Sequence, residues 1–274
     1  MSTHYLEVQE GQIAYDDSGS GPLVICAPSI GDLREEYRYL TPQLVAAGYR
    51  VITMDVRGHG ETSPQWADYS VGAIGSDMIA LIRSLDAGPA FIIGTSMAAG
   101  AAVWVATEAP DLVAGLVLVG PSVHGEVSWP NKLLYSALFA RPWGPSLWLK
   151  YYSTLYPTRK PVDFAPYCAA LRANLAQPGR IEALLRLALA SKAASEERLP
   201  RVTTPVLVIM GSKDPDFKHP EAEAQWVAKS LRGKVKMIKD AGHYPHAEMP
   251  EVTGPMMIQF LQENKEKEAI PYAT

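Results

Sequence analysis

The chain has 274 residues, of which 47% are hydrophobic and 20% are charged, so it can bury the core of one large globular domain or of a domain with an insertion. Its formal net charge of -4 offers no excess of positive charge to neutralise phosphates, which argues against a nucleic-acid partner. No apolar run reaches the roughly 18 residues of a membrane span, and the first ten residues lack a basic segment followed by an apolar one, so we expect a cytoplasmic protein.

The first predicted elements are strands. Residues 5–22 alternate around a turn at Glu10-Gly11, which predicts an antiparallel hairpin at a sheet edge. Short apolar runs rich in valine and isoleucine then alternate with longer stretches of helical period, and they lie at residues 22–27, 49–55, 90–94, 115–120, 205–210 and 235–240. Such runs are typical of strands that helices bury on both faces. The pattern predicts an α/β fold with a mostly parallel, doubly wound sheet of eight strands.

A serine stands where the apolar run at residues 90–94 meets a stretch of small residues. In "AFIIGTSMAAGAAVWVATEAP" a strand ends at Gly94 and a helix can begin at Met97, so Ser96 lies on the sharp turn between them. Gly94 and Ala98 leave room for strand and helix to cross, and the hydroxyl at the apex projects above the sheet edge. The Met97 NH then points to where an oxyanion would form. A plain helix N-cap is the alternative role for Ser96.

Residues 122–200 interrupt the alternation, because they contain several helix-like segments and no convincing strand. We therefore predict a core formed by residues 1–121 and 201–274, with residues 122–200 as an inserted helical cap. The insertion is rich in aromatic residues, which predicts an apolar lid over Ser96. The side chains that we expect to bind substrate are Trp129, Trp143, Trp148 and Tyr152. The last twelve residues, charged and then interrupted by Pro271, are expected to fray.

A serine hydroxyl needs a base to act as a nucleophile near neutral pH, normally a histidine held by a carboxylate. Asp214 follows the run at 205–210, and His243 follows the run at 235–240, at the strand ends where open parallel sheets place functional groups. We expect His243 to be the base and Asp214 to orient it. Asp216 on the same loop is the alternative acid.

Four motifs occur in the order of the α/β-hydrolase family, which the chain resembles over nearly its whole length. "DVRGHGETS" is similar to the loop after the family's fourth strand, "GTSMAA" to its nucleophile elbow, "GSKDPD" to its acid loop and "GHYPHAEMPE" to its histidine loop. The resemblance implies a serine hydrolase with the triad Ser96, Asp214 and His243, and the insertion takes the position of the family's cap. Ala98 is a mild departure, because the family's elbow usually has glycine there.

The segment "CAPSIGD" at residues 26–32 is the second departure, since the family usually has His-Gly at the end of its third strand. Ala27 and Pro28 take the place of that pair. We therefore expect the Ser29 NH to be the second oxyanion donor beside the Met97 NH, with the Ile30 NH as the alternative.

Other polar residues are expected to have structural roles. These are Arg57 and His59 in a tight loop, and His246, which we expect to pack in its loop or to lie at the surface; His124 and Glu126 are alternatives as acid or base. No His or Cys cluster predicts a metal, no glycine-rich turn predicts a dinucleotide cofactor, and Cys26 and Cys168 are expected to be free thiols.

The predicted activity is hydrolysis of carboxylic esters of apolar small molecules, with lactones and thioesters as related substrates. A cofactor-free lyase or oxygenase that uses the same triad, and a small-molecule receptor with little turnover, are the alternatives. A small apolar ester is the expected partner. The oligomeric state is left open, with a homodimer among the alternatives.

Overall fold

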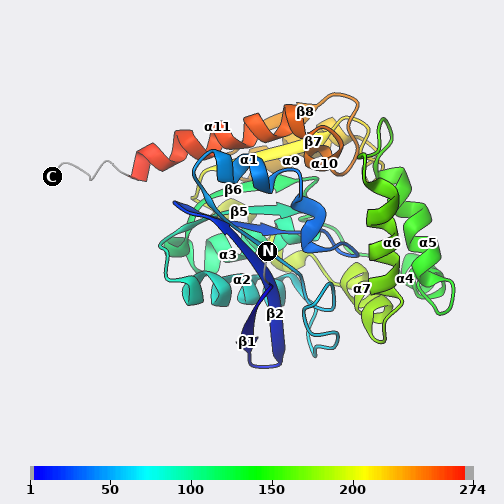
Figure 1. Ribbon diagram of the computed structural model, residues 1–274. Helices are drawn as coiled ribbons and strands as arrows, with labels where there is room; N and C mark the ends of the chain where they lie inside the picture. The colour runs from blue at the N-terminus through cyan, green and yellow to red at the C-terminus, as the bar shows by residue number, and fades with distance from the viewer. Residues whose placement is uncertain (1–2, 269–274) are drawn as a thin grey trace.

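The computed structural model describes residues 3–268 and places eight strands in one sheet (Figure 1). The strands are β1 His4–Val8, β2 Gly11–Gly19, β3 Leu23–Ala27, β4 Arg50–Met54, β5 Ala90–Thr95, β6 Val113–Val119, β7 Val206–Gly211 and β8 Lys234–Ile238. Their order is β1-β2-β4-β3-β5-β6-β7-β8; β2 is antiparallel to β1 and β4, and the other neighbours are parallel. The predicted fold class and the edge hairpin are confirmed.

Helices bury both faces of this sheet. They are α1 Thr41–Ala46, α2 Val71–Leu85, α3 Met97–Glu108, α9 Pro220–Ser230, α10 Pro245–Glu248 and α11 Pro250–Glu268. Along β3, Leu23 and Ile25 pack in the cluster that includes side chains of α2, α3 and α9, whereas Val24 and Cys26 pack with side chains of α1 and α11. Successive side chains of a strand point to opposite faces, so every residue of β3 is buried. This explains the continuous apolar runs in the sequence.

Residues 122–200 contain five α-helices and no strand. The helices are α4 Trp129–Leu138, α5 Gly144–Tyr152, α6 Phe164–Leu175, α7 Arg180–Leu189 and α8 Ala193–Glu196. Figure 1 shows α4 to α7 gathered to one side of the sheet. We call residues 122–200 the cap; its division from the core as a separate unit stays a prediction.

A buried carboxylate joins the cap to the loop after β3. Asp32 accepts hydrogen bonds from the hydroxyl of Tyr152 on α5, at 2.9 Å, and from the hydroxyl of Tyr167 on α6. The Leu33 NH is its third donor, at 2.9 Å. Desolvation raises the pKa of Asp32 to about 8. The first two contacts hold two cap helices against the core.

The C-terminal helix is longer than the sequence suggests. α11 continues to Glu268, so residues 263–268 are helical rather than frayed, and residues 269–274 lie outside the described part of the chain. No helix among residues 3–268 combines the length and apolar character that crossing a bilayer requires.

Candidate active site

Ser96 lies on a strained turn between β5 and α3. Its φ of 57° and ψ of -117° are rare for a residue other than glycine, and such backbone geometry costs about 1–3 kcal/mol. The Ser96 side chain makes no capping hydrogen bond to α3, so the structure gives no support to the N-cap alternative. A Cβ at Gly94 would lie 2.6 Å from the carbonyl oxygen of Ala98, which explains the glycine where strand and helix cross.

The predicted base and acid are in contact. His243 Nδ1 lies 2.7 Å from Asp214 Oδ2, and both side chains are buried. The alternative acid, Asp216, is exposed, and its Oδ2 is 3.7 Å from the same nitrogen. Asp216 instead accepts a hydrogen bond from the hydroxyl of Tyr151 in the cap. Asp214 is therefore the carboxylate that is hydrogen-bonded to the imidazole.

Two opposing effects set the protonation of His243. Burial disfavours the imidazolium, but the charges of Asp214 and Asp216 outweigh burial and raise the pKa of His243 to about 9. Nδ1 faces Asp214, and the buried Nε2 has no hydrogen-bond partner within residues 3–268. Nε2 is consequently the atom left to exchange a proton with a substrate or a nucleophile.

Ser96 and His243 line the same cavity, of about 710 Å³. Cap side chains form much of its wall: Tyr135, Leu138, Phe139, Leu147, Trp148 and Tyr151. Lys150, Lys192 and Asp216 add charged groups to this lining. A volume of this size accommodates a small organic molecule.

One of the four residues that we expected to bind substrate lines the cavity, and three do not. Trp148 lines the cavity, but the side chains of Trp129 and Trp143 are 72% and 50% exposed and do not. Tyr152 is fully buried beside Asp32 and is also absent from the lining. Trp129, Trp143 and Tyr152 are therefore not part of the cavity wall, because the first two side chains are largely exposed and Tyr152 is buried in its contact with Asp32.

The missed lining residues have a signal in the sequence. Tyr135, Leu138 and Phe139 are spaced by three and four residues, and the missed Leu147 and Tyr151 have the same spacing together with Trp148, which was among the expected residues. This spacing places each set on one face of a helix.

The structure also changes the expected oxyanion donors. Met97 is the first residue of α3 and lines the cavity, as the sequence analysis requires. The Ser29 NH, however, donates to Glu36 Oε2 at 2.8 Å, so it is not available to a substrate. The Ile30 NH has no partner within the described chain, and Ile30 lines the cavity. The alternative donor therefore fits better than the first choice.

The other polar candidates lie in structural contacts. Arg57 donates from Nε and Nη2 to Asp77, at 2.6 and 2.9 Å. His124 Nε2 lies 2.7 Å from Glu223 Oε1, and the hydroxyl of Ser191 donates to Glu126. Asp214, Asp216 and His243 each offer one atom that could bind a metal ion, and these atoms lie within 4.8 Å of one another. The shortest contact among them is the hydrogen bond between Asp214 and His243.

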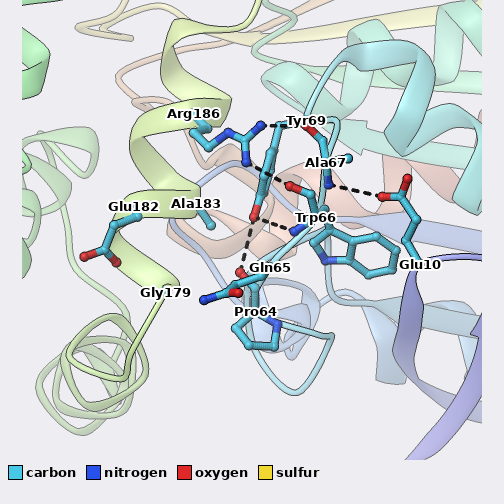
Figure 2. Close-up of a pocket in the computed structure, with 10 residues that line it drawn as sticks. All are labelled: Glu10, Pro64, Gln65, Trp66, Ala67, Tyr69, Gly179, Glu182, Ala183 and Arg186. Atoms are coloured by element: carbon cyan, nitrogen blue, oxygen red, sulfur yellow. Dashed lines mark hydrogen bonds between the residues drawn. The ribbon is translucent and has the colours of Figure 1, made fainter.

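A second cavity, of about 850 Å³, lies between α7 and the loop at residues 64–69 (Figure 2). Arg186 of α7 crosses it and donates to the carbonyl oxygens of Trp66 and Ala67, at 2.8 and 2.6 Å. Neither Ser96 nor His243 lines this cavity. We therefore place the candidate active site in the smaller one.

Comparisons with known proteins agree with this architecture. A family model described as "Alpha/beta hydrolase family" matches residues 24–253. The "Putative non-heme bromoperoxidase BpoC" of Mycobacterium tuberculosis (strain ATCC 25618 / H37Rv) is 31% identical over 262 residues, which cover 91% of this chain and 97% of that protein.

Two solved structures share the fold. A bromoperoxidase from Bacillus anthracis has a TM-score of 0.83 at 21% identity and covers 95% of this chain and 100% of its own. The esterase EaEST from Exiguobacterium antarcticum has a TM-score of 0.81 at 21% identity, with coverage of 96% and 100%.

Proposed function

Because the chain belongs to the alpha/beta hydrolase family, we propose that it is a serine hydrolase that cleaves carboxylic esters of apolar small molecules through an acyl-enzyme. One observation carries the proposal: His243, which is hydrogen-bonded to Asp214 at 2.7 Å, lines the same cavity as Ser96, and its Nε2 has no partner within residues 3–268. A nucleophile, a base and an orienting acid are the parts that acyl transfer requires.

The proposed reaction follows from these positions. The Ser96 hydroxyl attacks the ester carbonyl as His243 Nε2 takes its proton, while the Met97 and Ile30 NH groups stabilise the oxyanion. The tetrahedral intermediate expels the alcohol, which takes the proton from His243. Water then attacks the acyl-enzyme with His243 again as base, releasing the acid and restoring Ser96. Asp214 keeps the Nδ1 proton in place, so that Nε2 stays the basic nitrogen.

The cap wall supports an apolar acyl or aryl group. Leu138, Phe139 and Leu147 would surround such a group, whereas an unpaired charge buried among them would be costly. Lactones and thioesters present the same carbonyl to Ser96 and belong to the proposed substrate class. The chemistry needs no metal or cofactor. We also propose a cytoplasmic location, which the free thiols of Cys26 and Cys168 support.

Halide oxidation with peroxide is the second candidate, because BpoC and the Bacillus anthracis protein are named bromoperoxidases. Turnover of simple esters without peroxide or halide favours the hydrolase. Bromination of an organic acceptor without ester turnover favours the oxidation.

The proposed function is tested by labelling the protein with a fluorophosphonate, mapping the modified peptide and assaying a panel of p-nitrophenyl esters. We expect a single label on Ser96 and ester turnover that Ser96→Ala abolishes. A label at another residue, or full ester turnover by Ser96→Ala, would overturn the proposal.

A further inference from the structure

Buried side chains hold three backbone groups of Ser29 and Gly31, in the segment after β3. We call residues 28–32 the oxyanion loop. The Ser29 NH donates to Glu36 Oε2 at 2.8 Å, and the Gly31 NH donates to His59 Nε2 at 2.9 Å. The Gly31 carbonyl accepts from the indole NH of Trp148 in the cap, at 2.9 Å. Glu36, His59 and Trp148 come from three different parts of the chain.

These contacts bond the NH groups of two peptides and leave the NH of the peptide between them without a partner in residues 3–268. The Ser29 NH belongs to the peptide that precedes Ser29, and the Gly31 NH belongs to the peptide that follows Ile30. The peptide between them carries the Ile30 NH, which has no partner in residues 3–268. Because a peptide is planar, fixing both neighbours restricts the direction of the middle NH. Ile30 and Ser96 line the same cavity.

His59 can act as an acceptor only in one protonation state. Its Nδ1 lies 3.0 Å from the Arg57 carbonyl oxygen, which can only accept, so the ring proton belongs on Nδ1 and Nε2 is left to accept from Gly31. The ring is fully buried, and burial lowers the pKa of His59 to about 4. His59 therefore stays neutral near pH 7, where its Nε2 can always accept the hydrogen bond from the Gly31 NH.

Glu36 holds the other side of the loop. It is buried in the short 3-10 helix Arg34–Tyr37, and its second oxygen, Oε1, lies 3.0 Å from His246 Nε2. His246 lies in α10, three residues after His243. One side chain thus contacts both the oxyanion loop and the segment that carries the base.

We infer that His59 and Glu36 are positioning residues for the proposed ester hydrolysis, because they fix the peptides on either side of the Ile30 NH. This inference rests on the proposed function. An oxyanion donor that is already oriented before reaction lowers the barrier without reorganisation. Neither side chain lines the cavity, so their loss should lower kcat and leave KM nearly unchanged.

The test compares two substitutions of His59. His59→Leu removes the acceptor and should lower kcat on a p-nitrophenyl ester by about 10- to 100-fold, less than the loss of a whole donor, with KM within about twofold. The rate of Ser96 labelling by a fluorophosphonate should fall by a similar factor. His59→Gln returns a neutral acceptor and should recover most of the rate. Thr62→Val is the matched control, since Thr62 is buried in the same loop but bonds to Ala14 and Asp55.

Glu36 gives an independent pair of variants if His59→Leu fails to fold by circular dichroism. Glu36→Gln keeps an acceptor for the Ser29 NH and should retain most of the activity, whereas Glu36→Ala should lose kcat as His59→Leu does. Unchanged kcat in folded His59→Leu or Glu36→Ala, or a change in KM alone, would overturn this inference. A parent protein that neither reacts with fluorophosphonate nor cleaves esters would instead overturn the proposed function.

Discussion

Replacing Asp216 by asparagine should move the pH profile of the proposed reaction in a predictable direction. Asp216 Oδ2 is 3.7 Å from His243 Nδ1, and the Asp216 side chain, which lines the cavity, is 28% exposed. At that distance a full charge contributes about 1 kcal/mol in a water-like dielectric, which is slightly less than one pH unit. The charge of Asp216 helps raise the pKa of His243 to about 9, so Asp216→Asn should lower that pKa to just above 8.

In the proposed reaction His243 acts as the base. Neutral His243 is the active form, so kcat/KM should rise as pH rises through its pKa, and a lower pKa moves this rise to lower pH. At pH 7.5 the neutral fraction should increase about fivefold for a decrease of about 0.8 unit. At neutral pH the kcat/KM of Asp216→Asn should therefore exceed that of the parent by up to this factor. Above the pKa the two values should be equal.

The measurement is kcat/KM for a p-nitrophenyl ester from about pH 6 to about pH 10, followed at the isosbestic wavelength of p-nitrophenol. Asp111→Asn is the matched control, because it removes one exposed negative charge outside the cavity. A profile of Asp216→Asn that coincides with the parent's, or that moves to higher pH, would refute the electrostatic coupling of Asp216 to His243.

The remaining predictions concern the triad and the cap. Ser96→Ala should fold normally and lose roughly 10⁴-fold or more in kcat, about 5 kcal/mol; a variant with a native circular dichroism spectrum and more than a few per cent of ester turnover would contradict this. Asp214→Asn should lose about 10⁴-fold in kcat by misdirecting the imidazole, and the assignment of the acid fails if steady-state assays show a smaller loss than for Asp216→Asn. Affinity along a series of p-nitrophenyl esters should improve by up to about 0.8 kcal/mol per methylene until the cavity is full, and a succinyl monoester should be poorer. A flat length profile with equal activity on the charged ester would mean that the cap does not enclose the acyl group.

The sheet and the positions of Ser96, Asp214 and His243 could be predicted because they depend on local patterns. Strand β3 has an apolar side chain at every position, since both of its faces are buried, and the turn at Ser96 needs small neighbours that are visible in the sequence. The acid-loop motif favours Asp214 but leaves Asp216 as an alternative on the same loop, and the distances to His243, 2.7 against 3.7 Å, distinguish the two.

The oxyanion donor and the cap surface required coordinates for different reasons. The Ser29 NH is occupied by Glu36, seven residues further along the chain, and nothing in the residue types predicts that contact. Trp129 and Trp143 stand out by size, yet the packing of the cap helices decides which side chains meet the cavity. The rings of these two residues are largely exposed and do not line it.

Helix α5 divides its residues between two tasks, and this limits how the specificity of the protein can diverge or be redesigned. Leu147 and Tyr151 line the cavity, and Tyr151 also bonds to Asp216, so a mutational library at these positions can change the shape of the chamber. Trp148, which lines the cavity as well, bonds to Gly31 of the oxyanion loop, and Tyr152 bonds to Asp32. Transplanting a foreign cap without equivalents of these two side chains would change the substrate and impair the catalytic apparatus in the same step.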